Sequence, residues 1–288
     1  MNGMWLLRLR NGLVGRLKPE KTAAMFANYF LTPRSPAIKP CEQEVELRGK
    51  RSFFGKGDQY SALHWSAGEN RTGQTVLLVH GWESRATHMG QLIDPLLALG
   101  LVVVAIDGPA HGQSAGTTSN PVAFAHAISA AERRFGPFVG IVGHSIGGAA
   151  VAVAAELTVQ SASYVLLAAP ASLLQVLQSY ASFLGLPARC RQAFVSAVEA
   201  AVGISASRIH TGQLLALRKK PTLIIHSRDD VEVPVAAAQH IHQSLPDAEV
   251  WYPSGLGHRR LLKDAQVAQR VAQFIADNAS SRQQRRYG

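Results

Sequence analysis

Residues 142–148 read Val-Gly-His-Ser-Ile-Gly-Gly and join two segments of very different character. The run 138–141 before them is apolar, whereas the alanine-rich residues after them favour a helix. A serine that only capped this helix would need no glycine two residues before it and two residues after it. Such glycines are expected at a sharp turn, because side chains at Gly143 and Gly147 would collide with the neighbouring strand and helix. The pattern therefore predicts a strained turn that projects the hydroxyl of Ser145 from the end of a buried strand.

Short continuous runs of aliphatic and β-branched residues recur on both sides of this turn, which is typical of strands buried on both faces. These runs lie at 76–79, 101–106, 138–142, 164–167, 222–225 and 249–252. An antiparallel hairpin is expected before them, with strands at 42–48 and 60–65 around the turn Phe-Phe-Gly-Lys-Gly-Asp. Helices are expected at 88–99, 121–135, 146–159 and 260–277. The sequence thus predicts an α/β fold with a mostly parallel, twisted sheet of about eight strands and helices on both faces.

The spacing between strands is regular except at one place. About fifty residues separate Ala169 from Thr222, many more than a crossover helix needs, and apolar residues recur among them at helical spacing. We therefore expect a small helical cap at 171–213, inserted into a core formed by 41–170 and 214–280. A basic helical extension at 1–40 and a disordered basic tail at 281–288 complete the expected organisation.

Ser145 can act as a nucleophile only with help, because a serine hydroxyl needs a histidine base that is oriented by a carboxylate. His258 follows the last expected strand, and Asp230 follows the strand before it. Both residues lie beyond the carboxyl ends of strands, where open α/β sheets place their active sites. Asp229 is the alternative acid, because neighbouring carboxylates in one loop can exchange roles.

In these residues and their order the chain resembles the α/β-hydrolase superfamily, from the expected hairpin to the last helix. The segment His226-Ser227-Arg228-Asp229-Asp230, followed by Val233-Pro234, is similar to the family's acid segment with Ser227 in place of a glycine. This alignment favours Asp230 over Asp229 as the acid of the triad.

Two further segments extend the resemblance. The run 78–82, Leu-Val-His-Gly-Trp, is similar to the family's oxyanion segment, so the resemblance implies that the backbone N–H groups of Trp82 and Ile146 hold the oxyanion. The run 107–114 is similar to a second family loop, with Ala110 in place of a glycine. For this loop we expect a structural role, in which Asp107 and His111 hydrogen-bond the segment beneath the site.

The expected reaction is hydrolysis of a small or medium carboxylic ester or thioester through an acyl-enzyme on Ser145, with an apolar pocket under the cap and no cofactor. A peptidase of the proline-iminopeptidase type and a carbon–carbon bond hydrolase would use the same triad. A binding protein of this fold without catalysis is the alternative from another class. No histidine and carboxylate set recurs with metal-ligand spacing, so no metal is expected.

Bulk composition sets the remaining expectations. The chain of 288 residues is 47% hydrophobic and 17% charged, which suits one globular unit, and its two cysteines suggest neither a disulfide framework nor a zinc site, so a cytoplasmic setting is expected. Much of the net charge of +10 lies near the ends. Nucleic acid is not expected as a partner, because no aromatic residues alternate with the basic ones of the tail. Weak contact with an anionic membrane is an open alternative, because 4–17 mixes apolar and basic residues.

Overall fold

The computed structural model describes residues 2–66 and 73–287, apart from the side chains of residues 2, 4 and 280–287. One eight-stranded sheet forms the centre, with the strand order β1-β2-β4-β3-β5-β6-β7-β8. The pairs β1–β2 and β2–β4 are antiparallel and all other neighbouring pairs are parallel. The strands are β1 Lys50–Phe54, β2 Tyr60–Ser66, β3 Thr75–Val79, β4 Val102–Asp107, β5 Phe138–His144, β6 Tyr164–Leu167, β7 Thr222–Ile225 and β8 Glu249–Trp251. The expected α/β sheet is confirmed.

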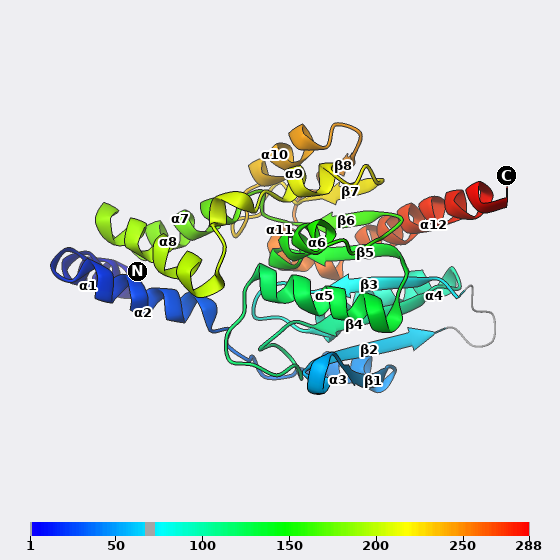
Figure 1. Cartoon of the computed structure of the whole chain (residues 1–288), viewed down its shortest axis with the longest axis horizontal. Helices are drawn as coiled ribbons and strands as arrows, with labels where there is room; N and C mark the ends of the chain where they lie inside the picture. The colour runs from blue at the N-terminus through cyan, green and yellow to red at the C-terminus, as the bar shows by residue number, and fades with distance from the viewer. Residues whose placement is uncertain (1, 67–72, 288) are drawn as a thin grey trace.

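Helices cover both faces of this sheet (Figure 1). They are α1 Asn2–Leu17, α2 Pro19–Leu31, α3 Pro40–Leu47, α4 Ile93–Ala98, α5 Pro121–Phe135, α6 Ile146–Glu156, α7 Leu173–Phe183, α8 Ala188–Val202, α9 Thr211–Ala216, α10 Ala236–Ser244, α11 Gly257–Arg260 and α12 Ala265–Tyr287. Two buried clusters lie on opposite sides of the strands, one with α5 and α6 and the other with α4 and α12. Successive residues of β3 alternate between them: Leu77 belongs to the first and Leu78 to the second. Burial on both faces explains why these strands are continuously apolar.

The predicted first strand at 42–48 is wrong, because residues 40–47 form helix α3. Pro40 occupies the start of this helix, where the missing N–H of a proline costs nothing, and the Glu42 carboxylate accepts the backbone N–H of Lys39 at 3.4 Å. The hairpin does form, but its first strand is β1, which includes the phenylalanines that the sequence had assigned to the turn.

The N-terminal extension and the insertion between β6 and β7 pack together beyond one end of the sheet (Figure 1). Helices α1 and α2 thus join α7 and α8 of the cap expected at 171–213, and from here on the helical cap means all four helices. Ala23 and Phe26 of α2 are buried with Cys190 and Phe194 of α8, and the Cys190 thiol donates to the carbonyl of Pro19 at 3.5 Å. The sequence predicted both helical segments but not their contact with one another.

The last helix is longer than expected. Helix α12 continues to Tyr287, so the backbone of 281–287 is helical where the sequence predicted a disordered tail, and residue 288 lies outside the described residues. Glutamine and arginine favour helices, which accounts for the extension. None of the helices in the described part of the chain combines the length and the apolar character that a bilayer span requires.

Candidate active site

Ser145 lies at the turn between β5 and α6 with φ 53° and ψ −126°, a backbone conformation that non-glycine residues rarely adopt. Two hydrogen bonds hold it there: its N–H donates to the carbonyl of Leu167 at 2.8 Å, and its carbonyl accepts the N–H of Gly148 at 2.9 Å. A Cβ on Gly143 would lie 2.6 Å from the Cα of Gly148, and one on Gly147 would collide with the carbonyl of His80. The expected need for glycine at both positions is confirmed.

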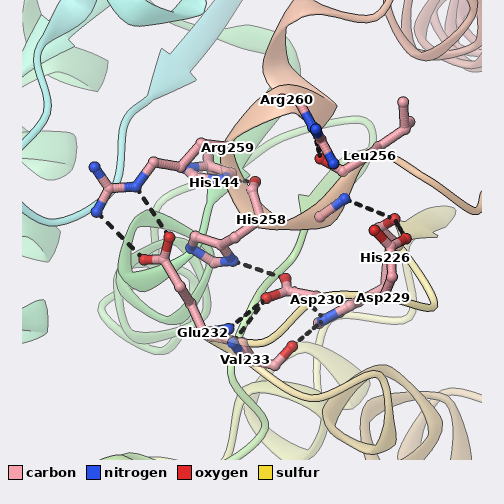
Figure 2. A network of polar contacts seen from close by, with 12 residues as sticks. His144, His226, Asp229, Asp230, Glu232, Val233, Leu256, His258, Arg259 and Arg260 are labelled. Carbon is pink, nitrogen blue, oxygen red and sulfur yellow. Dashed lines mark hydrogen bonds and ion pairs between the residues drawn. The ribbon is translucent and has the colours of Figure 1, made fainter. Parts of the chain in front are cut away.

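His258 in the short helix α11 and Asp230 in the loop after β7 point toward one another (Figure 2). The backbone carbonyl of His258 is bonded to His144, the residue before Ser145, which places the pair near the turn. The Nδ1–H of His258 donates to Oδ2 of Asp230 at 2.7 Å, and both side chains are buried. The other oxygen, Oδ1, accepts the backbone N–H groups of Glu232 and Val233, each at 2.9 Å. The carboxylate is therefore fixed in position and dictates that His258 carries its proton on Nδ1, which leaves Nε2 free to accept one.

The charge of Asp230 is stabilised although the group is buried. Desolvation by itself would raise the pKa of Asp230, but hydrogen bonds from His226 and His258 and from the Val233 N–H outweigh it and hold the pKa well below its ordinary value. Nε2 of His226 lies 3.4 Å from Oδ2 of Asp230, and its N–H donates to the carbonyl of Val233 at 2.8 Å. Asp230 is thus ionised throughout the physiological pH range.

Asp229, the alternative acid, has a different role. Its Oδ1 accepts the hydroxyl of Ser227 and the N–H of Gly255, both at 2.7 Å, and the Ser227 oxygen in turn accepts the N–H of Gly257 at 3.1 Å. These bonds fix the loop that carries His258. The geometry therefore favours Asp230 as the partner of His258, and Ser227 acts as a link that a glycine could not provide.

His144, the last residue of β5, joins this strand to the segment that carries His258. Its Nε2–H donates to the backbone carbonyl of His258 at 3.1 Å, and the two rings lie 4.8 Å apart between centroids. Burial lowers the pKa of His144 to about 3, so the ring stays neutral. Its position next to Ser145 was the only sign in the sequence that it could belong to the site.

The segment after β3 runs beside the same turn, since a Cβ on Gly81 would lie 3.0 Å from Cβ of Ser145. Two histidines fix this segment. His80 donates from Nδ1 to the carbonyl of Gly81 at 2.6 Å and accepts the N–H of Gly108 at 2.9 Å. His111 accepts the N–H of Glu83 at 3.1 Å, which confirms the expected structural role of the 107–114 loop.

Of the two residues expected to hold an oxyanion, Ile146 lies at the Ser145 turn and Trp82 lies in the segment beside it. Trp82 directly follows Gly81, and Ile146 is the first residue of α6. The N–H of a first helical residue has no carbonyl partner within its helix, so the Ile146 N–H can serve a ligand.

Aromatic side chains of the helical cap cover Trp82. Its ring stacks on that of Phe30 from α2 at 6.2 Å and 15°, and Phe30 makes edge contacts with Tyr180 at 5.0 Å and Phe194 at 5.9 Å. Just after α2, Arg34 forms an ion pair with Glu83 at 2.6 Å. The N-terminal extension thus contacts the segment that follows β3, a feature that the sequence did not reveal.

A groove of about 610 Å³ runs along α7 and α8 and is lined by residues that include Leu174, Arg191 and Glu199, but not by Ser145 or His258. Among the described residues, no group of three or more histidine, cysteine, aspartate and glutamate side chains is placed to hold a metal ion.

A mostly parallel α/β sheet with a serine at a strand-to-helix turn, and a histidine–aspartate pair that follows later strands, defines the class of α/β hydrolases. The model of the Alpha/beta hydrolase family matches residues 76–270. The chain therefore belongs to the α/β-hydrolase family, and its fold is the fold of that family.

Solved structures agree with this assignment. An esterase of Pyrococcus furiosus, Pf2001, is 20% identical with a TM-score of 0.63, over 86% of this chain and 97% of the esterase. Est1E from Butyrivibrio proteoclasticus is 16% identical with a TM-score of 0.64, over 80% and 99% of the two chains. A bromoperoxidase from Bacillus anthracis is 16% identical with a TM-score of 0.60, over 79% and 100%. At these identities the likeness concerns the fold alone. Comparison with curated proteins found no match.

Proposed function

We propose that the protein is a serine hydrolase that cleaves a small or medium carboxylic ester or thioester through an acyl-enzyme. The observation that carries the proposal is the buried pair of His258 and Asp230, 2.7 Å apart, with the carbonyl of His258 bonded to His144, the residue before the strained Ser145. Esterases among the structural neighbours support the reaction class.

In the first step the hydroxyl oxygen of Ser145 attacks the carbonyl carbon while Nε2 of His258 takes the hydroxyl proton. The N–H groups of Trp82 and Ile146 stabilise the negative oxygen of the tetrahedral intermediate. His258 then gives its proton to the leaving alcohol or thiol. A water molecule, activated in the same way by His258, attacks the acyl-enzyme and releases the acid and the free serine. Asp230 stabilises the charged imidazolium in both steps.

The aromatic cluster of Phe30, Trp82, Tyr180 and Phe194 favours an apolar acyl or alcohol group in the substrate, because it borders the segment expected to hold the oxyanion. An ester with a hydrocarbon chain suits such a surface better than a charged peptide does.

The test is hydrolysis of p-nitrophenyl esters of increasing chain length by the wild type and by Ser145→Ala, with an amino-acid anilide in parallel. We expect ester cleavage, and a loss of several orders of magnitude in the alanine variant. Labelling of Ser145 by an organophosphonate is the second readout. Cleavage of the anilide in preference to the esters would indicate a peptidase. A failure of both hydrolysis and labelling would indicate a binding protein of this fold.

A further inference from the structure

Helix α1 is packed with its polar and small residues inward. Asn11 is only 3% exposed and donates from Nδ2 to the carbonyl of Leu184 at 3.0 Å. Gly15 lies so close to the turn between α7 and α8 that a Cβ there would be 2.8 Å from Pro187. This face attaches the helix to the rest of the helical cap.

The outward face of α1 is apolar. Trp5, Leu9, Leu13 and Leu17 recur every fourth residue, so they share one face of the helix. Trp5 is 63% exposed and Leu17 is 80% exposed. A surface helix ordinarily turns such residues toward the core, so this arrangement is the reverse of the usual one. Neighbouring exposed leucines make it a continuous apolar surface of the kind that marks an interaction site. We call it the leucine face.

Positive charge accompanies the leucine face. Arg10 and Arg16 are exposed and fall on the same half of the helix, and Lys18 and Lys21 follow directly. The sequence of α1 contains no acidic residue, and the nearest one along the chain, Glu20, pairs with Arg189 at 2.8 Å. A second copy of this chain on the same face would oppose arginine with arginine. An anionic lipid surface instead supplies both an apolar layer for the leucines and phosphates for the arginines.

We propose that α1 docks the protein on an anionic lipid surface, with the leucine face entering the interface and the arginines contacting lipid phosphates. Helix α2 of the helical cap contacts Trp82, in the segment that runs beside the Ser145 turn, so docking would bring this end of the molecule to the lipid. The leucine face takes no part in the hydrolytic chemistry. Lipid docking and the proposed hydrolase function can therefore each be wrong without the other.

The first test is co-sedimentation of the full chain with vesicles of phosphatidylcholine alone or mixed with phosphatidylglycerol. We expect binding to the mixed vesicles that weakens as salt rises. The double variant Leu9→Ser/Leu13→Ser should bind at least about tenfold more weakly, whereas the control Leu47→Ser/Leu217→Ser, at leucines 85% and 71% exposed elsewhere, should bind as the wild type does.

The charges are tested in the same way. Arg10→Gln/Arg16→Gln should weaken binding to the mixed vesicles by about thirtyfold. Lys56→Gln/Lys220→Gln removes two exposed charges elsewhere and should change little. Trp5 offers a local readout, because entry of its indole into the interface shifts its fluorescence to shorter wavelength. The shift should be missing in Trp5→Phe.

Three results would overturn the proposal. The Leu9→Ser/Leu13→Ser variant could bind vesicles as tightly as the wild type, which would assign binding to another surface. The wild type could bind no vesicle at low salt. It could also form a dimer that this double variant dissociates, which would make the leucine face a contact between copies. Each variant should hydrolyse a water-soluble ester as fast as the wild type does, which verifies its fold. Loss of vesicle binding is then distinguished from loss of the proposed hydrolytic function.

Discussion

Replacing Asp230 by asparagine tests the proposed chemistry sharply, because the surroundings dictate which way the new amide must face. Oδ1 accepts two backbone N–H groups at 2.9 Å, and Oδ2 accepts the Nδ1–H of His258 at 2.7 Å. In the Asp230→Asn variant the amide oxygen must take the place of Oδ1, since an NH₂ group there would face two donors. The NH₂ group then points at Nδ1 of His258.

The consequence is the wrong tautomer of His258. Nδ1 must accept the amide hydrogen, so the ring proton moves to Nε2, which can no longer take the proton of Ser145. We expect kcat to fall by about 10³ to 10⁴, equivalent to about 4 to 5.5 kcal/mol of transition-state stabilisation, with KM little changed.

Asp229→Asn is the matched control. Oδ1 of Asp229 accepts from Ser227 and Gly255, and an amide oxygen can accept both bonds equally well, so this variant should keep most of its activity. Initial rates over a range of p-nitrophenyl ester concentrations give kcat and KM, and thermal unfolding verifies the fold of each variant. If Asp230→Asn retains more than about a tenth of the wild-type kcat, or if Asp229→Asn loses as much activity, the assignment of the acid is wrong.

Three further outcomes follow from the site. The pKa of His144 is lowered to about 3, so between pH 6.5 and 3 the unfolded chain binds a proton that the folded chain does not. This difference in proton binding by His144 should lower the free energy of unfolding by about 2 kcal/mol between pH 7 and pH 5. Denaturant titrations at both pH values measure it, and the same pH dependence in His144→Gln would contradict it. Ser227→Ala removes the bonds to Asp229 and Gly257, so it should lower the free energy of unfolding by about 1 to 3 kcal/mol and should also lower kcat. An unchanged kcat would show that Ser227 does not position His258. Phe30→Ala should lower stability by about 2 kcal/mol and raise KM for long esters more than for short ones, and equal effects on both would place the substrate elsewhere.

The inner parallel strands were predictable because they are buried on both faces and are therefore largely apolar, as residues 76–79 of β3 illustrate. The segment 42–48 was misread because Val45 and Leu47 alternate with glutamates as in a half-buried strand. The proline at position 40 was the better guide, since it favours the first turn of a helix.

The meeting of His258 with Asp230 was predictable because residues at the carboxyl ends of neighbouring parallel strands gather at one edge of a sheet. The contact of Phe30 with Trp82 was not, since it depends on how α2 packs against a helix far away in the sequence. The bond from His144 to the carbonyl of His258 was equally hidden, because a backbone acceptor leaves no trace in the residue type.

The packing of α2 against α8 has a consequence for how the chain folds during its synthesis. The thiol of Cys190 and the carbonyl of Pro19 that it reaches are 171 residues apart in the chain. At ordinary rates of synthesis, roughly 10 to 30 seconds pass between the emergence of one helix and the other. Throughout that interval the apolar side of α2, with Ala23, Phe26 and Leu31, has no native partner to cover it. The nascent chain therefore offers a binding site to chaperones long before Ser145 is in place to react.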